Sequence, residues 1–407
     1  MTPPPIAMIL GSFPEISQKF ILNQIAGLLD EGVDLDVYAG MENRDGRQHS
    51  LVTTYGMLGR TRFAGVPRLP RDRLRLFPSA FGRALLLGPT RAIRALLPRY
   101  TVASRSMKNL FFLAAFGHRR YEIVHCQFGP NGLVGAFLKD AGIARRLVVT
   151  FHGSDINSYP RRRGSRVYRT LYDRADLITA NTSFTRARLV DNGCPPSKIE
   201  VLPVGLLMSE YPLTPVDERV PGMVLTVGRL VEKKGHRYAL EAMARLRGRV
   251  PSLHYVIAGD GPERQRLEQR AADLGIAELV SFLGTCNDQV VRDLYRRAAV
   301  FVLPSVTASG GDMEGQGLVL QEAQAAGIPV VSTLHNGIPE GVREGETGFL
   351  VPERDAAALA DRIGVLLEDS DRRRRMGAAG RGFVASTYDM PILTRRLMEM
   401  YDDVRAR

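Results

Sequence analysis

Four charged residues in the second half of the chain have the types and spacing that sugar-nucleotide chemistry needs. Glu314 and Glu322 flank the start of an expected helix, with seven residues between them. Arg229 and Lys234 stand on a loop that follows an expected strand. Carboxylates accept hydrogen bonds from hydroxyl groups, and Arg and Lys bind the oxygens of a diphosphate. Together these residues predict a site for a sugar linked to a nucleoside diphosphate.

The stretch 301–332 is expected to position the two acids. It predicts a buried strand at Phe301–Pro304, a loop rich in Gly and acid, a helix at about Gly317–Ala326, and a second buried strand at Pro329–Ser332. Open α/β sheets bind ligands at the carboxyl ends of their strands, where helix N-termini favour phosphate groups. We therefore expect the ligand to lie against this loop.

The order of strand, polar turn and helix recurs along the whole chain, which predicts an α/β fold of two doubly wound units in tandem. We expect one domain at 1–205, a second at 206–388, and a last helix at 389–407 that packs back on the first. The polar stretch Tyr211–Gly222, with three prolines, reads as the linker. The polar loops of both halves follow strands, so we expect the two loop faces to oppose each other across a cleft.

The first half also carries polar residues at the ends of its expected strands. Gly11 follows the strand Ile6–Leu10 in a predicted glycine turn, and His152 follows Leu147–Phe151. A lone His is often structural, so both a structural and a functional role stay open for His152. Three further polar residues are candidates for the acceptor side: Asn131 in the turn Gly129–Gly132, Asp155 and Asn181.

Composition sets the class of protein. The 407 residues are 44% hydrophobic and 24% charged, as in ordinary globular proteins. Three cysteines far apart indicate reduced thiols and a cytosolic compartment. We expect neither a signal peptide nor a membrane span. We also expect no bound metal, because no His/Cys cluster is present and Asp34-Leu35-Asp36 leads into a strand.

The net charge of +12 is concentrated in residues 60–120, which hold thirteen Arg and Lys108 against Asp72 alone. Leucines and phenylalanines alternate with these arginines. Five prolines are expected to divide the segment into short helical pieces: Pro67, Pro70, Pro78, Pro89 and Pro98. Basic amphipathic helices bind anionic membrane surfaces. The alternative is a set of solvated arginines over an ordinary core. Nucleic acid is not an expected partner, because no recognition motif or aromatic platform is present.

These residues resemble a known family. The segments GGDMEGQGLVLQEAQAAGIPVVS, VGRLVEKKGH and VIAGDGPER resemble the Glu-X7-Glu signature, the diphosphate loop and the nucleotide-side turn of retaining glycosyltransferases of family 4, which have the GT-B fold. The segments LGSFPEISQKFILNQI, HCQFGPNG and TFHGSDIN resemble the bacterial exopolysaccharide branch, which includes colanic acid and amylovoran glycosyltransferases. The resemblance covers nearly the whole chain.

The resemblance implies a role for each motif residue. Glu322 would hold the ribose and Glu314 the hydroxyls of the donor sugar. The implied catalytic set is Glu314, His152, Arg229 and Lys234, with the two cations on the diphosphate and His152 reaching the donor sugar. The implied donor-binding set is Gly11, Gly228, Gly261, Gly315, Gln316, Gly317, Leu318 and Glu322. Gln316 departs from the family, which more often has an aromatic residue there, so the sugar preference stays open.

The resemblance implies retaining transfer of a hexose, without a metal or other cofactor. The donor would be a UDP- or GDP-sugar, and attack on the same face would let the leaving phosphate take the acceptor proton. From the basic segment we expect a lipid-linked saccharide acceptor, with the protein peripheral on the cytoplasmic face of the inner membrane. Two alternatives stay open: a sugar-nucleotide epimerase of the same architecture, and a non-catalytic membrane scaffold.

Overall fold

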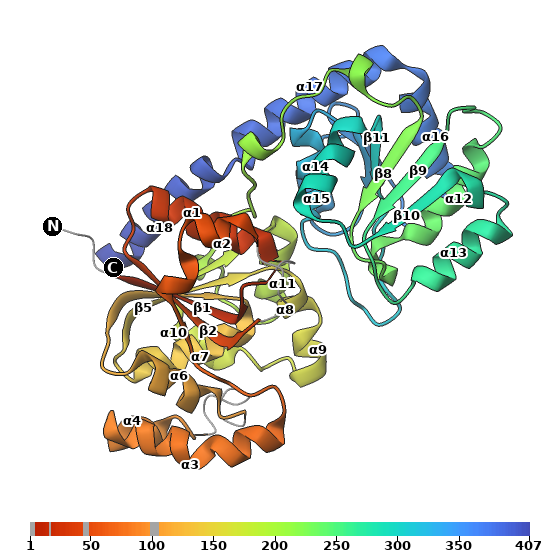
Figure 1. The fold of residues 1–407 in the computed structure, drawn as a ribbon. Coiled ribbons are helices and arrows are strands. Elements are labelled where there is room, and N and C mark those ends of the chain that lie inside the picture. The colour runs from red at the N-terminus through yellow and green to blue at the C-terminus, as the bar shows by residue number, and fades with distance from the viewer. Residues whose placement is uncertain (1–4, 16–17, 44–48, 98–105) are drawn as a thin grey trace. The chain divides into compact units, whose positions relative to one another are not determined.

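The computed structural model describes residues 5–15, 18–43, 49–97 and 106–407 (Figure 1). The chain divides into two compact units. Unit 1 comprises Met1–Leu202 and Thr394–Arg407, and unit 2 comprises Pro203–Leu393. Each unit is built on a parallel sheet with helices on both faces, which confirms the predicted α/β class with two Rossmann-like units.

Unit 1 has a seven-stranded parallel sheet in the order β3-β2-β1-β4-β5-β6-β7. Its strands are β1 Ile6–Phe13, β2 Leu35–Glu42, β3 Thr61–Phe63, β4 Tyr121–Gln127, β5 Ala144–Phe151, β6 Leu177–Ala180 and β7 Ile199–Val201. Ile6 of β1 pairs with Leu35 on one side and with Ile123 on the other. The central strands are buried on both faces, which is why they read as continuous apolar runs.

The helices of unit 1 connect these strands. They are α1 Lys19–Asp30, α2 Ser50–Thr54, α3 Pro70–Leu86, α4 Pro89–Arg94, α6 Lys108–Phe116, α7 Gly129–Asp140, α8 Ser154–Asn157, α9 Tyr159–Arg163, α10 Arg169–Arg174 and α11 Ser183–Asp191. The turn predicted at Gly129–Gly132 is wrong, because these residues form the first turn of α7. A Cβ on Gly129 would lie 2.4 Å from the Phe151 ring, so glycine lets α7 start close against the sheet.

The glycine turn predicted at Gly11 is also wrong. Strand β1 continues through Gly11 to Phe13, and Ser12 still pairs with Met41. A Cβ on Gly40, in the neighbouring strand, would lie 2.6 Å from the carbonyl oxygen of Gly11. The close approach therefore requires glycine at Gly40, whereas a Cβ on Gly11 would only come within 3.9 Å of Nδ2 of Asn131.

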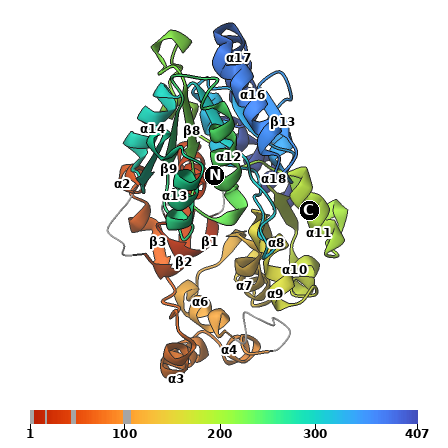
Figure 2. The same ribbon diagram turned by 90° about the vertical axis from the view of Figure 1, so that its right-hand side faces the viewer.

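Helix α3 is longer than the prolines predict. It runs for 17 residues with Pro78 inside it, so Pro78 does not divide the segment. Pro78 and Leu74 are both exposed, and water can therefore reach the turn in which Pro78 removes a helical hydrogen bond. Both views place α3 and α4 next to α6 at one edge of unit 1 (Figures 1 and 2). The predicted break at Pro98 lies outside the described residues.

Unit 2 has a six-stranded parallel sheet in the order β10-β9-β8-β11-β12-β13. Its strands are β8 Met223–Val227, β9 His254–Ala258, β10 Val280–Gly284, β11 Val300–Leu303, β12 Val330–Thr333 and β13 Gly348–Val351. Its helices are α12 His236–Leu246, α13 Arg264–Asp273, α14 Asp288–Arg297, α15 Leu318–Ala325, α16 Ala356–Glu368 and α17 Ser370–Thr387. The apolar faces of α12, α13 and α16 cover one side of the sheet.

The segment predicted as a linker is part of unit 2 instead. Arg219 is buried and lies at the junction of several chain segments. Its guanidinium donates hydrogen bonds to the backbone oxygens of Thr214, Tyr295, Arg296, Ala298 and Ala326. Five carbonyl groups thus depend on one side chain, which a polar, proline-containing sequence does not reveal.

Helix α18, Met390–Ala406, carries the chain from unit 2 into unit 1. The Tyr401 hydroxyl lies 2.7 Å from Nδ1 of His125, whose Nε2 lies 2.7 Å from Oγ1 of Thr150. Burial lowers the pKa of His125 to about 3, so the imidazole is neutral near pH 7. This buried polar chain fixes the end of α18 on β4 and β5.

Candidate active site

Two loops of unit 2 leave the sheet side by side. Strands β8 and β11 are paired in parallel, with Phe301 opposite Leu225. The loop after β8, residues 228–235, and the loop after β11, residues 304–317, therefore start at the same edge. These are the loops that the sequence predicts to hold the ligand.

An ion pair joins the two loops. Nζ of Lys234 lies 2.7 Å from Oε2 of Glu314, and the two side chains are only 12% and 15% exposed. Burial by itself would raise the pKa of Glu314, but the charges of Lys234 and Lys233 lower it to about 2. Glu314 is therefore a carboxylate near pH 7 and can accept hydrogen bonds from hydroxyl groups.

Lys233 also holds the acid-rich loop, a role that the sequence reasoning missed. Its side chain is buried, and Nζ lies 3.3 Å from Oδ2 of Asp312 and donates to the carbonyl of Met313. Its own carbonyl accepts the N–H of Val306. Lys233 reads as part of a solvated basic turn in the sequence, and only tertiary contacts reveal its function.

Arg229 differs from the two lysines because its side chain is exposed. Within the part of the chain that the structure describes, its guanidinium makes no hydrogen bond or ion pair. The carbonyl of Arg229 lies 3.0 Å from Nε2 of His236 in the first turn of α12, which fixes the backbone at this point. An unpaired guanidinium on a fixed backbone suits an anionic ligand.

The predicted glycines mostly serve backbone packing. A Cβ on Gly261 would lie 2.4 Å from the carbonyl oxygen of Leu230, and the N–H of Gly228 bonds to the carbonyl of Ala258. Gly317 has φ +73° and precedes Leu318, the first residue of α15. Gly315 is buried in the preceding loop. These positions let the loops approach each other and turn into the helix.

Gln316 pairs with the backbone of unit 2. Its Oε1 accepts the N–H of Val204 at 2.8 Å, and its Nε2 donates to the carbonyl of Val204 at 2.8 Å. The side chain is 5% exposed. Both polar atoms are thus engaged within the protein, which gives this amide a structural role in unit 2.

Glu322 lies in α15 and accepts a hydrogen bond from the Tyr295 hydroxyl at 2.8 Å. The Tyr211 hydroxyl also bonds to Glu322. Burial raises the pKa of both tyrosines well above the usual value, so both hydroxyls keep their protons. Binding of a ribose by Glu322 stays a prediction.

His152, in unit 1, has a fixed ring orientation. The imidazole lies against the rings of Phe20 and Phe128, with centroids 4.8 and 4.6 Å away. Its Nε2 lies 2.8 Å from Oε1 of Gln127, whose Nε2 donates to Oε1 of Gln24 at 2.6 Å. Burial lowers the pKa of His152 to about 3. The ring is therefore neutral, and Nδ1 is left as a buried acceptor without a partner among the described residues.

The three acceptor-side candidates are buried, and they hold the loops around His152. Asp155 accepts the N–H of His152 on Oδ1 and that of Gly129 on Oδ2. Nδ2 of Asn181 donates to the carbonyl of His152, and Nδ2 of Asn131 donates to that of Gln127. Burial raises the pKa of Asp155 to about 6, although backbone N–H groups oppose this rise.

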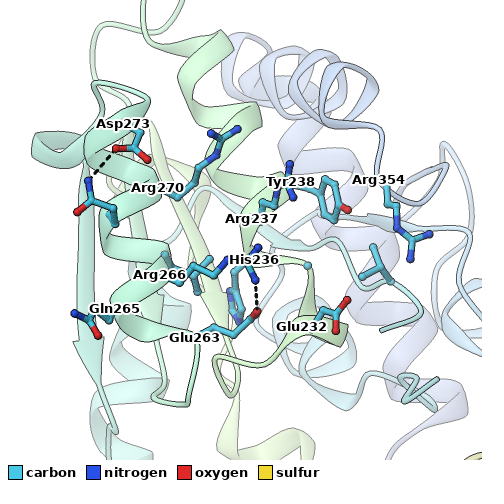
Figure 3. Close-up of a pocket in the computed structure, with 14 residues that line it drawn as sticks. Glu232, His236, Arg237, Tyr238, Glu263, Gln265, Arg266, Arg270, Asp273 and Arg354 are labelled. Carbon is cyan, nitrogen blue, oxygen red and sulfur yellow. Dashed lines mark hydrogen bonds and ion pairs between the residues drawn. The ribbon is translucent and has the colours of Figure 1, made fainter. Parts of the chain in front are cut away.

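A hollow of about 660 Å³ lies between α12 and α13 (Figure 3). Its wall includes Glu232, His236, Glu263, Arg266 and Arg354. The predicted site residues are not among its lining side chains. Both site loops nevertheless form part of its wall, through Glu232 and Gly235 of the first and Val306 of the second.

The described residues hold neither a metal-binding cluster nor a membrane-spanning helix. Within those ranges, no group of three or more His, Cys, Asp and Glu side chains is placed to hold a metal ion. None of the helices in the described parts of the chain is both long and apolar enough to span a bilayer. Independence of the reaction from a metal stays a prediction.

Comparison with known proteins identifies the family. Residues 17–205 match the glycosyl transferase 4-like domain, and residues 218–383 match the glycosyl transferases group 1. A candidate colanic acid biosynthesis glycosyltransferase of Escherichia coli K12 is 34% identical over 97% of this chain and 98% of its own. The amylovoran biosynthesis glycosyltransferase of Erwinia amylovora is 28% identical over 96% and 97%.

A mannosyltransferase is also similar. The GDP-mannose-dependent phosphatidylinositol monomannoside mannosyltransferase of Mycolicibacterium smegmatis is 33% identical over 75% of this chain and 81% of its own. Among solved structures, an Anabaena protein in complex with UDP has a TM-score of 0.72 at 18% identity, covering 98% of this chain and all of the other. These matches confirm the resemblance predicted from the motifs, and the chain belongs to the family 4 glycosyltransferases, which have the GT-B fold.

Proposed function

We propose that the protein transfers a hexose, with retention, from a nucleoside diphosphate sugar to a membrane-associated saccharide acceptor in exopolysaccharide biosynthesis. The observation that carries this proposal is the Lys234–Glu314 ion pair beside the exposed Arg229, at the carboxyl edge of the unit 2 sheet. The names of the colanic acid and amylovoran relatives support the pathway class.

The charges of the site suggest the roles of these residues. Glu314 is ionised, so it accepts hydrogen bonds from the hydroxyls of the donor sugar. Arg229 and Lys234 stabilise the negative charge that develops on the departing diphosphate, and such preorganised charge is usually the largest catalytic term. Glu322 binds the ribose.

We infer attack on the same face of the sugar. The acceptor oxygen forms a bond to the anomeric carbon while the bond from that carbon to the phosphate oxygen breaks, and the leaving phosphate takes the acceptor proton. The carboxylate of Asp155 accepts a backbone N–H on each oxygen, which argues against its use as a covalent nucleophile. His152 remains neutral and offers Nδ1 as an acceptor.

The proposed donor carries either uridine or guanosine, because the names of similar proteins include both UDP and GDP-mannose. A thermal-shift screen with UDP, GDP, UDP-glucose and GDP-mannose tests binding, since a ligand of the folded state raises the melting temperature. Transfer assays with the stabilising donor, followed by NMR of the product anomer, test retention. An epimer of the donor formed without acceptor would favour the epimerase alternative.

A surface of unit 1 supports a membrane-bound acceptor. We call residues 69–97, with α3 and α4, the α3–α4 surface. Of the fourteen large apolar side chains that are exposed among the described residues, eight lie on this surface: Leu69, Leu74, Leu76, Leu85, Leu86, Ile93, Leu96 and Leu97. Ala80 and Ala84 of α3 are buried, and Phe77 and Phe81 pack against the core while partly buried. The leucines of the helix are left exposed.

The same surface is cationic. Arg71, Arg75, Arg83 and Arg94 are exposed, and Asp72 is the one acidic residue between 69 and 97. Exposed leucines with arginines are the composition of helices that lie in a membrane interface, where each cation contributes ~1 kcal/mol near anionic lipids. The mycobacterial relative is named for a phosphatidylinositol-based acceptor, which supports a lipid-linked substrate. We propose that the α3–α4 surface binds anionic bilayers.

A further inference from the structure

His335 lies where the loop that carries Glu314 is fastened to the rest of unit 2. It follows β12 and is 1% exposed. Its Nε2 accepts the backbone N–H of Glu314 at 3.1 Å, and its Nδ1 lies 2.5 Å from Oε1 of Glu353. The imidazole therefore connects the backbone of a predicted catalytic residue to a carboxylate at the end of β13.

The backbone contact fixes the tautomer of the ring. A backbone N–H can only donate, so Nε2 of His335 must carry a lone pair. The proton of the neutral ring is then on Nδ1, which donates it to Glu353. Burial opposes ionisation of Glu353, but the hydrogen bonds from His335 and Thr307 lower its pKa below the usual value. The pair is thus a neutral imidazole oriented by a carboxylate.

Glu353 also holds the other end of the same loop. Its Oε2 accepts the N–H of Thr307 at 3.0 Å, and Oε1 lies 3.4 Å from the Thr307 hydroxyl. Nη2 of Arg354 donates to the carbonyl of Thr307 at 2.6 Å. One carboxylate therefore fastens the loop near its start, at Thr307, and through His335 near its end, at Glu314.

The residues that follow the pair have strained backbones. Asn336 has φ +48° and Arg354 has φ +65°, in the left-handed region that residues other than glycine seldom adopt. The strained conformation of Asn336 is accompanied by a hydrogen bond, in which its Nδ2 donates to the carbonyl of Glu314 at 3.1 Å. Both backbone groups of Glu314 are thus held by the His335–Asn336 dipeptide. Such strain persists where the surrounding structure fixes a functional geometry.

We propose that His335 and Glu353 are positioning residues that fix the backbone of Glu314 and thereby aim its carboxylate at the donor sugar. The catalytic part of this inference rests on the proposed function. The structural part is that His335 is neutral with its proton on Nδ1. It does not depend on which reaction the protein catalyses. In this role neither His335 nor Glu353 contacts the donor. Their replacement should therefore leave diphosphate binding by Arg229 and Lys234 unchanged.

A matched pair of variants separates the two contacts. His335→Gln keeps an acceptor near the Nε2 position for the Glu314 N–H, whereas His335→Asn keeps a donor near the Nδ1 position for Glu353. Because misplacement of a catalytic group by about 1 Å costs on the order of 100-fold in rate, we expect His335→Asn to lose roughly 10- to 100-fold in kcat. His335→Gln should lose less. Binding of UDP or GDP, measured by calorimetry, should change less than twofold in both.

His254→Gln is the control, because His254 is exposed and, among the described residues, its side chain bonds to Ser281 alone. It should keep the wild-type kcat. Equal, near-normal kcat for both His335 variants would overturn the positioning role. Equal loss of nucleotide binding and kcat would also overturn it, because it would indicate general disruption of the site.

Nitrogen NMR of the wild-type protein tests the inference directly. It needs neither an activity assay nor a variant that folds. Of the seven histidines, His335 is assigned by loss of its signals in His335→Gln or, if that variant fails to fold, by through-bond transfer from its backbone. We expect a neutral ring at pH 7.5 with a protonated Nδ1 and an unprotonated Nε2. A proton on Nε2 would overturn the inference. If donor transfer itself is absent, the proposed function fails while this tautomer result still stands.

Discussion

Nζ of Lys234 lies 2.7 Å from Oε2 of Glu314, so a cation predicted to bind diphosphate is paired with the acid predicted to bind the sugar. The two loops of the site are joined by this contact. A donor that binds at both residues would have to share Lys234 between the carboxylate and its own phosphates. If both residues have their predicted roles, the pair couples recognition of the sugar to recognition of the diphosphate.

Glu314→Gln should separate turnover from nucleotide binding. The amide cannot accept a sugar hydroxyl as strongly as a carboxylate, and loss of a charged hydrogen bond costs about 1.5–3 kcal/mol, or roughly 10- to 100-fold in kcat. The Lys234 ammonium is released at the same time, so UDP or GDP should bind as well as before or more tightly. Steady-state kinetics and calorimetry measure the two effects, with the exposed Glu346→Gln as control. Weaker binding of the nucleoside diphosphate would contradict the coupling.

Lys234→Ala and Arg229→Ala should have the opposite pattern. Each substitution removes a cation that is expected to bind the diphosphate. Both nucleotide affinity and kcat should therefore fall, by on the order of 10-fold or more. Lys234→Ala also leaves Glu314 buried without its ion-pair partner and should lower the melting temperature. Arg229→Ala should not, because Arg229 is exposed. Near-normal rates in both variants would exclude a diphosphate site on this loop.

The ion pair also predicts a dependence of stability on pH. The pKa of Glu314 is about 2 in the folded protein, against 4.5 for the free side chain. Folding therefore favours the ionised form, and this stabilisation is complete above about pH 4.5 and is lost as the pH falls toward 2. At 1.36 kcal/mol per pKa unit it amounts to roughly 3 kcal/mol. The difference in melting temperature between wild type and Glu314→Gln should shrink over this range, and a constant difference would contradict the ion pair.

The sequence predicts the sheets well because parallel strands are short apolar runs between Gly and polar turns. The strand expected at Phe301–Pro304 lies at Val300–Leu303 in the structure, one residue earlier at each end. The site loops are also predictable, because each follows such a strand. What the sequence misses are contacts between loops. His335 is 21 residues from Glu314 and 18 from Glu353, and only its place shortly after a strand could have marked it as a candidate.

Other differences have a similar cause. Gly11 and the stretch Tyr211–Gly222 have the composition of a turn and a linker, yet tertiary packing makes one a strand residue and the other part of a unit. Helix α3 passes through Pro78 because that side of the helix faces water. The local sequence of a segment indicates its backbone preferences. It does not indicate which residues from other parts of the chain will contact that segment.

Arg219 gives a test of the fold that is independent of catalysis. Arg219→Met would leave up to five backbone oxygens without their donor, and each unsatisfied buried group costs about 1–3 kcal/mol. We therefore expect a loss of stability on the order of 3 kcal/mol or more, seen as faster hydrogen exchange in peptides around Ala298 and Ala326. Arg374→Met is the control, because Arg374 is exposed and pairs with surface acids. Unchanged exchange in Arg219→Met would refute the anchoring role.

Membrane binding by the α3–α4 surface should have an electrostatic and an apolar component that two variants can separate. Replacing Arg71, Arg75 and Arg83 by Gln should remove the dependence of liposome flotation on anionic lipid and salt, because salt screens exposed charges. Replacing Leu74, Leu85 and Leu86 by Ser should weaken flotation at every salt concentration, because less apolar area enters the interface.

Two comparisons make this membrane prediction specific. The exposed Leu213 and Leu283 of unit 2 provide the control, and their replacement by Ser should leave flotation unchanged. Both α3–α4 variants should keep wild-type binding of UDP or GDP, since they lie in unit 1 and far in sequence from the nucleotide loops, but should lose transfer to a lipid-linked acceptor. If flotation of the wild type depends on neither anionic lipid nor salt, the exposed arginines do not contribute to membrane binding. Equal flotation by the leucine variant and the wild type would show that the exposed leucines do not enter the bilayer.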